Sequence, residues 1–302
     1  MTLRLCVLEG RAHAVIDAGD GGTGASGEGR ALDLERATGG RLPSDPMACY
    51  ASWRQVRAGA GVVLADAASP NPHPTVRAAT RPFTHEELGN PSPGPSQVFA
   101  VGINYRAHAA EMGNPVPAAP LIFGKWQSAI AAPSAPLRIT GETCDFEAEL
   151  VVVVGEGGRD VPEARAWDAV AGLCVGQDLS DRTLQYAGTP PQFGLGKSRA
   201  GYAPYGPWVT DAAGLASRDD LAIGCRVSGE TMQSSRTSDM VFGVASVVAY
   251  LSAVVELRPG DVIFTGTPPG VGAGRTPKRF LRAGDVIETT IESLGTITTR
   301  CV

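Results

Sequence analysis

The chain has 302 residues, of which 43% are hydrophobic and 19% charged, a balance typical of a globular protein and unlike that of a disordered chain. Its formal net charge of −5 provides no basic surface for a phosphate backbone, so nucleic-acid binding is not expected. The 38 glycines and 23 prolines imply many turns, which favours a strand-rich fold over a bundle of long helices.

Residues 1–95 predict a small N-terminal α/β domain. Strand candidates at residues 3–10 and 13–18 precede a glycine-rich loop at residues 20–29, and one helical window spans residues 47–60. The chain begins without the apolar run of a signal peptide, and its six cysteines show no CxxC spacing. We therefore expect reduced thiols and a cytoplasmic location.

A connector and a larger domain follow. Alternating prolines in NPSPGPSQ, residues 90–97, favour an extended chain. Residues 96–302 predict short strands with connections too short for crossover helices, which favours a mixed or antiparallel β-roll or barrel over a doubly wound sheet. The strand candidates are VFAVGIN, PLIFGK, AELVVVVG, AGLCVGQDLS, YGPWVT, LAIGCRVSGE, DVIFTGT and DVIETTIESLGTITTRCV.

Two helices are expected in this larger domain, near residues 162–170 and 240–257. The second is apolar enough to raise the question of a membrane span. It barely reaches the required length and contains Glu256, so we interpret it as a buried helix capped by Ser238 or Asp239. No membrane association is expected.

Alternating carboxylates occupy the segment DFEAELVVVVG, residues 145–155. On a strand Asp145, Glu147 and Glu149 would leave one face, while the apolar residues between them enter the core. A divalent cation would relieve the repulsion between these carboxylates, although a solvated strand face is the commoner reason for such a pattern. Asp178, after another apolar stretch, is either a further ligand or the N-cap of a helix formed by DRTLQ.

His108 stands three residues before Glu111 in VGINYRAHAAEMG. In a helical turn the two side chains would share a face, so the carboxylate could orient the imidazole as a general base for water. An exposed surface pair is the alternative interpretation. Lys125, Lys197 and Thr267 lie in loops rich in glycine or proline, where such side chains can hold a carboxylate or an oxyanion.

The order and spacing of several separated blocks resemble the fumarylacetoacetate hydrolase family over residues 97–302. The resemblance implies an α+β, strand-rich fold with a mixed β-roll, a homodimer, and a divalent metal that binds a small 2-oxo acid. The metal would be Mg²⁺ or Mn²⁺, with Ca²⁺ as a further candidate. The blocks are GINYRAHAAE, PLIFGK, DFEAELVVVVG, VGQDLSDRTLQ, GLGKS, YGPWVT, SGETMQSSRTSDMVF, LRPGDVIFTGTPPGVG and AGDVIETTIESLG.

The same resemblance assigns roles to single residues. It implies that Glu147, Glu149 and Asp178 are the metal ligands, with Asp145 outside the coordination shell. It also implies that His108 and Glu111 activate water.

Five further residues would contact substrate. Lys197, with Gln185 nearby, would stabilise developing negative charge, and Thr267 would bind a substrate carboxylate. Arg106 and Lys125 fall where the family often keeps basic residues near its pocket.

The expected activity is hydrolysis of a C–C bond in a small 2,4-dioxo acid of acylpyruvate or fumarylpyruvate type. The same metal site would also support decarboxylation of a β-oxo acid such as oxaloacetate, or isomerisation of an oxo-diene dioate. A non-catalytic, metal-stabilised binding protein is the alternative from a different class. One departure from the family pattern lies beside a proposed ligand, because Gln177 stands where an asparagine commonly precedes the metal aspartate.

Overall fold

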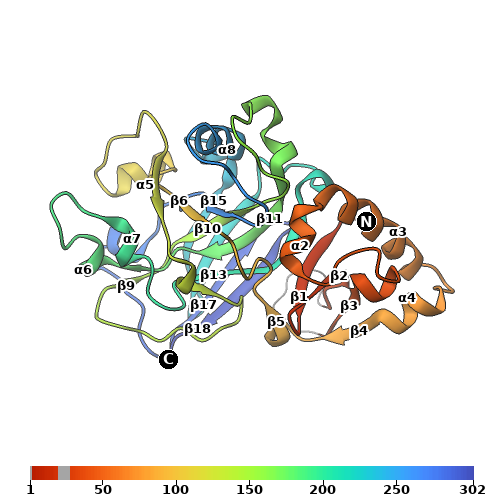
Figure 1. The fold of residues 1–302 in the computed structure, drawn as a ribbon. Coiled ribbons are helices and arrows are strands. Elements are labelled where there is room, and N and C mark those ends of the chain that lie inside the picture. Colours follow the sequence, from red (N-terminus) through yellow and green to blue (C-terminus); the bar gives the residue numbers. More distant parts are fainter. Residues whose placement is uncertain (1, 20–27) are drawn as a thin grey trace.

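The computed structural model describes residues 2–19 and 28–302, so most of the glycine-rich loop predicted at residues 20–29 lies outside the described residues. A large mixed sheet of 12 strands runs through the molecule (Figure 1). In spatial order its strands are β4 (Thr80–Phe83), β3 (Gly29–Asp33), β2 (Arg11–Asp17), β1 (Arg4–Leu8), β13 (Ala203–Asp211), β11 (Val170–Gln177), β10 (Ala148–Val154), β16 (Val262–Phe264), β6 (Val98–Gly102) and β7 (Leu121–Gly124), with β5 (Leu88–Gly89) beside β1 and β8 (Ile130–Ala131) beside β13.

The centre of this sheet is buried on both faces. Every residue of β10, β11 and β13 is buried, and valine dominates β10, as expected for strands packed on two sides. Most pairs are antiparallel, while β16 pairs with β6 and β13 with β8 in parallel. The predicted α+β, strand-rich fold with a mixed sheet is confirmed.

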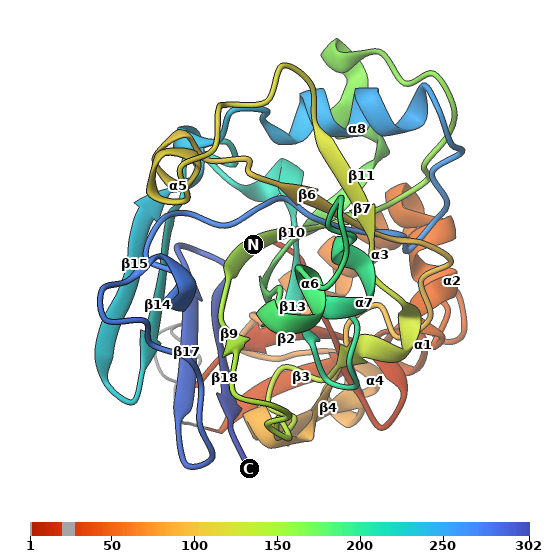
Figure 2. The same cartoon turned by 90° about the vertical axis from the view of Figure 1, so that its left-hand side faces the viewer.

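A second sheet covers one side of these strands. It has the order β15 (Glu230–Arg236), β14 (Ala222–Val227), β17 (Val286–Ile291) and β18 (Gly295–Arg300), and it contacts β10, β11 and β13. Figure 2 shows this sheet beside β9 (Cys144–Asp145), which pairs with β12 (Ser180–Asp181). Much of the main hydrophobic core lies between the two sheets.

The N-terminal strands continue the large sheet. β1 pairs antiparallel with β13, and Leu5 lies opposite Val209. Tyr50 and Trp53, from the N-terminal helices, belong to the same core as β10 and β11. The connector is also fixed, because the Ser92 hydroxyl donates to the Gly260 carbonyl at 2.7 Å. The division at residue 95 stays a prediction, but the two parts share a sheet and a core.

The helices differ in their bounds from the predicted segments. The window at residues 47–60 falls on two helices separated at Ser52, the second of which continues to Ala67, and the segment at 162–170 is a 3₁₀ turn. The α-helices are α1 (Leu34–Ala37), α2 (Pro46–Ala51), α3 (Trp53–Ala67), α4 (Pro74–Ala79), α5 (Arg106–Glu111), α6 (Arg182–Gln185), α7 (Phe193–Gly196) and α8 (Val244–Ser252). The 3₁₀ turns are η1 (His85–Glu87), η2 (Gln127–Ala129), η3 (Glu163–Ala169), η4 (Ala212–Gly214), η5 (Thr237–Asp239) and η6 (Gly272–Gly274).

The helix predicted at residues 240–257 is α8, which begins after Gly243 and ends at Ser252. The proposed caps were wrong, because Ser238 and Asp239 belong to the separate turn η5. Within the described part of the chain, no helix is both long and apolar enough to cross a membrane. All six cysteines are described, and each is buried and unpaired.

Candidate active site

Three buried carboxylates meet where β10 pairs with β11. Glu149 lies on β10, Glu147 directly precedes that strand, and Asp178 directly follows β11. The pairing aligns Glu149 with Gly176, and the Asp178 N–H donates to the Glu147 carbonyl at 2.9 Å. One oxygen from each carboxylate lies within 4.8 Å of the others, and no member of the cluster is more than 4% exposed.

The structure excludes the two simpler explanations of these residues. The strand face is buried, so its carboxylates do not meet solvent. The N-cap of α6 is Asp181, whose carboxylate accepts from the Leu184 N–H at 3.1 Å, and not Asp178. Asp145 lies outside the cluster, where its carboxylate accepts from the Gly272 N–H at 2.7 Å.

The cluster suits a hard divalent cation. Carboxylate oxygens are the donors that Mg²⁺ and Mn²⁺ prefer, and three of them converge here in a buried position. Gln177 helps to fix this arrangement, because its side-chain oxygen accepts from the Glu147 N–H at 2.8 Å. The glutamine that departs from the family pattern therefore supports the backbone of a candidate ligand.

Three buried cations neutralise the carboxylates. Lys197 Nζ lies 2.5 Å from a Glu147 oxygen and 2.7 Å from an Asp178 oxygen. Arg182 donates to Glu147 at 2.6 Å and to Asp145 at 2.8 Å. Lys125 Nζ lies 2.5 Å from the other Asp178 oxygen. Burying carboxylates this closely is tolerable only because each cation lies in direct contact with at least one of them.

The pKa values of the two glutamates move in opposite directions. Burial raises the pKa of Glu149 well above its usual range, and the nearby charges of Asp178 and Glu147 raise it further. Burial alone would also raise the pKa of Glu147, but the charges of Lys197 and Arg182 outweigh burial and lower that pKa to about 2. Glu147 is thus held as the anion by its cations, while ionisation of Glu149 is opposed by its neighbours.

His108 and Glu111 form the predicted pair on α5. His108 Nδ1 lies 3.0 Å from Glu111 Oε2. A carboxylate can only accept, so Nδ1 carries the proton and Nε2 is left as a proton acceptor. His108 is 8% exposed and lines the same cavity as the carboxylate cluster, so the pair is not an ordinary exposed surface contact. The arrangement can serve as a general base.

One loop after β16 fixes carboxylates from three different segments. Its backbone N–H groups donate to Glu149, to Glu111 and to Asp145, so the loop ties helix α5 to the cluster. Glycine is required at Gly270, where φ is +108° and a Cβ atom would lie 2.1 Å from the Met232 carbonyl oxygen. The donors are Gly266 N to Glu149 at 2.7 Å, Gly270 N to Glu111 at 2.8 Å, and Gly272 N and Ala273 N to Asp145 at 2.7 and 3.0 Å.

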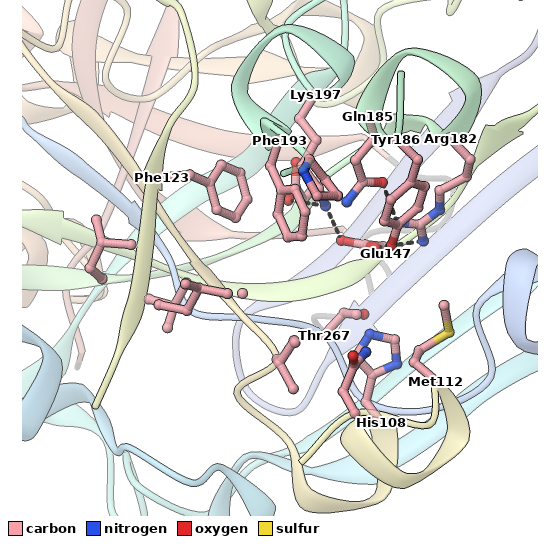
Figure 3. Close-up of a pocket in the computed structure, with 18 of the residues that line it drawn as sticks. His108, Met112, Phe123, Glu147, Arg182, Gln185, Tyr186, Phe193, Lys197 and Thr267 are labelled. Atoms are coloured by element: carbon pink, nitrogen blue, oxygen red, sulfur yellow. Dashed lines mark hydrogen bonds and ion pairs between the residues drawn. The ribbon is translucent and has the colours of Figure 1, made fainter. Parts of the chain in front are cut away.

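A cavity of about 450 Å³ brings most of the predicted residues together. Figure 3 shows the Glu147 carboxylate between Lys197 and Arg182, with His108 across the cavity from them. Glu111 lies behind His108, which it contacts directly. The predicted residues in the cavity wall are His108, Glu147, Glu149, Asp178, Gln185, Lys197 and Thr267.

Two of the predicted basic residues, Arg106 and Lys125, do not line the cavity as far as the described residues define it. Arg106 is exposed and donates to the Met240 carbonyl at 3.3 Å. Lys125 lies behind Asp178 and also donates to the Lys197 carbonyl. Thr267 does line the cavity, but its hydroxyl donates to the Ala148 carbonyl at 2.9 Å and accepts from the Gln233 amide at 2.8 Å, so only one lone pair remains for a ligand. The substrate-binding roles of these residues stay predictions.

The sequence interpretation missed several cavity residues. Arg182 is not among the predicted site residues, although it binds two carboxylates. The aromatic side chains Phe123, Phe193 and Tyr186 also line the cavity. No local pattern identifies them, because they come from β7, the start of α7 and the residue after α6.

Two solved structures similar to this chain differ in how much of it they match and how closely. The "putative HpcE protein" of Mycobacterium smegmatis is 45% identical, with a TM-score of 0.85 and 99% of each chain covered. The fumarylpyruvate hydrolase of Pseudomonas aeruginosa, solved with Mn²⁺ and pyruvate, is 35% identical, with a TM-score of 0.63, over 69% of this chain and 90% of that one.

Among curated proteins, the mitochondrial oxaloacetate tautomerase fahd2 of Xenopus laevis is 42% identical over 209 residues, which are 68% of this chain and 66% of that protein. The match thus spans about two thirds of that relative's length. The family model described as fumarylacetoacetate (FAA) hydrolase C-terminal matches residues 97–302, the same range that the sequence blocks indicated. The chain belongs to the fumarylacetoacetate hydrolase family of enzymes.

Proposed function

We propose that this protein is a divalent-metal-dependent hydrolase that cleaves a C–C bond in a small 2,4-dioxo acid of acylpyruvate or fumarylpyruvate type. The observation that carries the proposal is the contact between His108 and Glu111 at the wall of a cavity that also holds the buried carboxylates. A base oriented in this way beside a cation site is suited to activate water against a polarised carbonyl.

Glu147, Glu149 and Asp178 would hold the metal, as Mg²⁺ or Mn²⁺, with Ca²⁺ as a further candidate. When bound, the ion supplies Lewis-acid polarisation of the 2-oxo group and stabilises the charge of an enolate leaving group. The Mn²⁺ and pyruvate in the fumarylpyruvate hydrolase structure support both the metal and the product class.

His108 Nε2 accepts a proton from a water molecule, and the water oxygen attacks carbon 4 of the 2,4-dioxo acid. Lys197 donates to the resulting oxyanion together with Gln185. The Gln185 oxygen accepts from Arg182 at 2.9 Å, so its amide N–H groups remain for this role. The bond between carbons 3 and 4 then breaks, and its electron pair stays on carbon 3. Carbon 4 leaves as a carboxylic acid, and return of the proton to carbon 3 gives pyruvate.

The test is a comparison of His108→Ala with wild type for pyruvate release from acylpyruvates and for Mn²⁺ affinity. Loss of a positioned general base lowers the rate by about 10² to 10⁴-fold, and Mn²⁺ binding should be retained. His73→Asn is a suitable control, because His73 is exposed and caps α4, where asparagine also caps well. Hydrolysis by the His108→Ala variant at the wild-type rate would contradict the assignment of the base.

A second candidate is proton transfer without attack by water, on a β-oxo acid such as oxaloacetate. The relative named as an oxaloacetate tautomerase favours it. In tautomerisation His108 would move a proton on or off carbon 3. In decarboxylation the same carbon would take up a proton after CO₂ leaves. Loss of the enol absorbance without pyruvate release would support tautomerisation, and CO₂ release would support decarboxylation.

We also propose a homodimer, which light scattering of the purified protein would test.

A further inference from the structure

The cavity wall combines two kinds of side chain. The carboxylate cluster and its cations form a charged end. Beside it lie three aromatic side chains: Phe123 at β7, Phe193 at the start of α7, and Tyr186 after α6. Figure 3 shows Phe123 and Phe193 side by side, close to Lys197. A substrate held by its 2-oxo acid group at the charged end would therefore extend its other end along the rings.

The rings form one continuous wall. The ring centroids of Phe123 and Phe193 lie 5.6 Å apart in an edge-to-face arrangement. Those of Tyr186 and Phe193 lie 6.1 Å apart in a similar arrangement. Lys197 Nζ lies 5.4 Å from the centroid of Phe123, so the wall begins directly beside the charged end. Faces and edges of this kind favour an apolar or aromatic ligand group.

The charged residues of the cavity wall also favour an uncharged group beside the rings. Among the described residues of its wall the strong cations are Arg182 and Lys197. Arg182 is bound to Glu147, Asp145 and Gln185, and Lys197 to Glu147 and Asp178. Two of the three Lys197 N–H groups are thus taken by protein carboxylates and the third is assigned to the oxyanion, so neither cation is left to pair with a second carboxylate of a substrate. A carboxylate placed against the rings would lose water without gaining a counter-ion.

We propose that this site selects 2-oxo acids whose far end is an alkyl or aryl group and discriminates against dicarboxylates. The proposal rests on the proposed function only in placing the 2-oxo acid group at the carboxylate cluster. It makes Phe123, Phe193 and Tyr186 the residues that determine specificity. Acylpyruvates with an apolar acyl group, rather than fumarylpyruvate or oxaloacetate, are then the preferred substrates.

Binding of 2-oxo acids that cannot be hydrolysed tests the selection separately from catalysis. With Mn²⁺ present, titration calorimetry would compare 4-phenyl-2-oxobutanoate with 2-oxoadipate, which has a carboxylate at its far end. We expect the phenyl compound to bind on the order of tenfold to a hundredfold more tightly. Equal or tighter binding of 2-oxoadipate, or no binding of either acid, would overturn the proposal.

Substitutions of the aromatic residues test whether the rings cause the preference for the phenyl compound. Phe193→Ala should bring the affinity ratio close to one, while Tyr250→Ala, an exposed aromatic of α8 away from the cavity, should leave it unchanged. Tyr186 is 48% exposed, so Tyr186→Arg should fold, and its new cation should reverse the preference towards 2-oxoadipate. An unchanged ratio in both ring variants would contradict the role of the wall.

The two proposals fail in different ways. If the phenyl compound binds preferentially but no acylpyruvate is hydrolysed, the hydrolase assignment is wrong and the selection stands. If acylpyruvates are hydrolysed but fumarylpyruvate is preferred over benzoylpyruvate, the selection is wrong and the hydrolase assignment stands.

Discussion

Lys197 Nζ lies 2.5 Å from Glu147 Oε2, inside the cluster that we propose holds the metal. The same nitrogen contacts Asp178, so one lysine bridges two of the three candidate ligands. Burial would lower the pKa of Lys197, but the charges of Asp178 and Glu147 outweigh burial and raise it. The lysine is therefore a firmly charged internal counter-ion, and the carboxylates do not depend on a metal alone for neutralisation.

This relationship predicts that chelation removes activity without unfolding the protein. The chelated wild type should keep native circular dichroism and a single cooperative melting transition, because its cations remain in place. A catalytic site behaves in this way, whereas a structural metal contributes directly to folding. Unfolding of the wild type on chelation would favour the alternative of a metal-stabilised binding protein.

Removal of Lys197 should make stability depend on the metal. Lys197→Ala leaves Glu147 and Asp178 short of a cation, which costs about 3–5 kcal/mol in the metal-free state. Added Mn²⁺ should recover much of this loss. The measurement is the melting temperature with chelator and with Mn²⁺, and the exposed Lys278→Ala is the matched control. Equal chelator effects in the two variants would argue against the counter-ion role.

A substitution at Gly274 should affect the His108–Glu111 base and not metal binding. A Cβ atom at Gly274 would lie 2.6 Å from the Glu111 carboxyl carbon. That carboxyl group is the end of a flexible side chain, so it can move, but it then leaves its contacts with His108 and Gly270. Gly274→Ala should therefore fold and bind Mn²⁺ normally.

Hydrolysis by Gly274→Ala should fall about tenfold or more, because a misplaced base loses much of its contribution. Steady-state kinetics should show the loss mainly in kcat, with a smaller change in KM. Gly61→Ala is the control, since a Cβ atom there meets nothing within 4 Å. Wild-type kcat in Gly274→Ala would show that Glu111 does not need its observed position.

The sequence patterns identify strands better than they identify where helices end. The run Ala148–Val154 is a strand because its branched apolar residues pack on both faces. The apolar run at 240–257 is longer than α8, because Leu257 lies beyond the helix, in a β-bridge with Gly158, and is buried in the core there. Periodicity alone cannot separate an apolar residue that continues a helix from one that a distant segment buries.

In the site, too, the sequence predicts contacts between residues that are close in the chain but not contacts between distant ones. His108 and Glu111 are close in the chain, so their spacing predicts their contact. Arg182 meets Glu147 across 35 positions, and only the fold brings the two together. The aromatic wall is likewise a product of the fold, because Phe123 and Phe193 come from segments 70 residues apart.

Asp33 predicts how stability depends on pH. Its buried carboxylate accepts from Arg11 at 2.8 Å and caps α1 by accepting from the Arg36 N–H at 3.0 Å. Burial would raise the pKa of Asp33, but these bonds outweigh burial and lower it. A carboxyl group with a lower pKa in the folded state adds stability above its unfolded pKa of about 3.9, and this stability is lost as the pH falls through the folded pKa.

Asp33→Asn should thus be less stable than wild type at pH 7, by about 1–2 kcal/mol, because it loses the ion pair with Arg11 but keeps a capping oxygen. The difference should shrink as the pH falls below about 4, where the carboxyl group of the unfolded chain takes up a proton, and disappear once the pH is below the lower pKa of folded Asp33. Urea denaturation at a series of pH values measures both free energies of unfolding. The exposed Asp219→Asn should follow the wild-type curve. A gap between Asp33→Asn and wild type that stays constant down to pH 2 would show that the charge of Asp33 does not stabilise the fold.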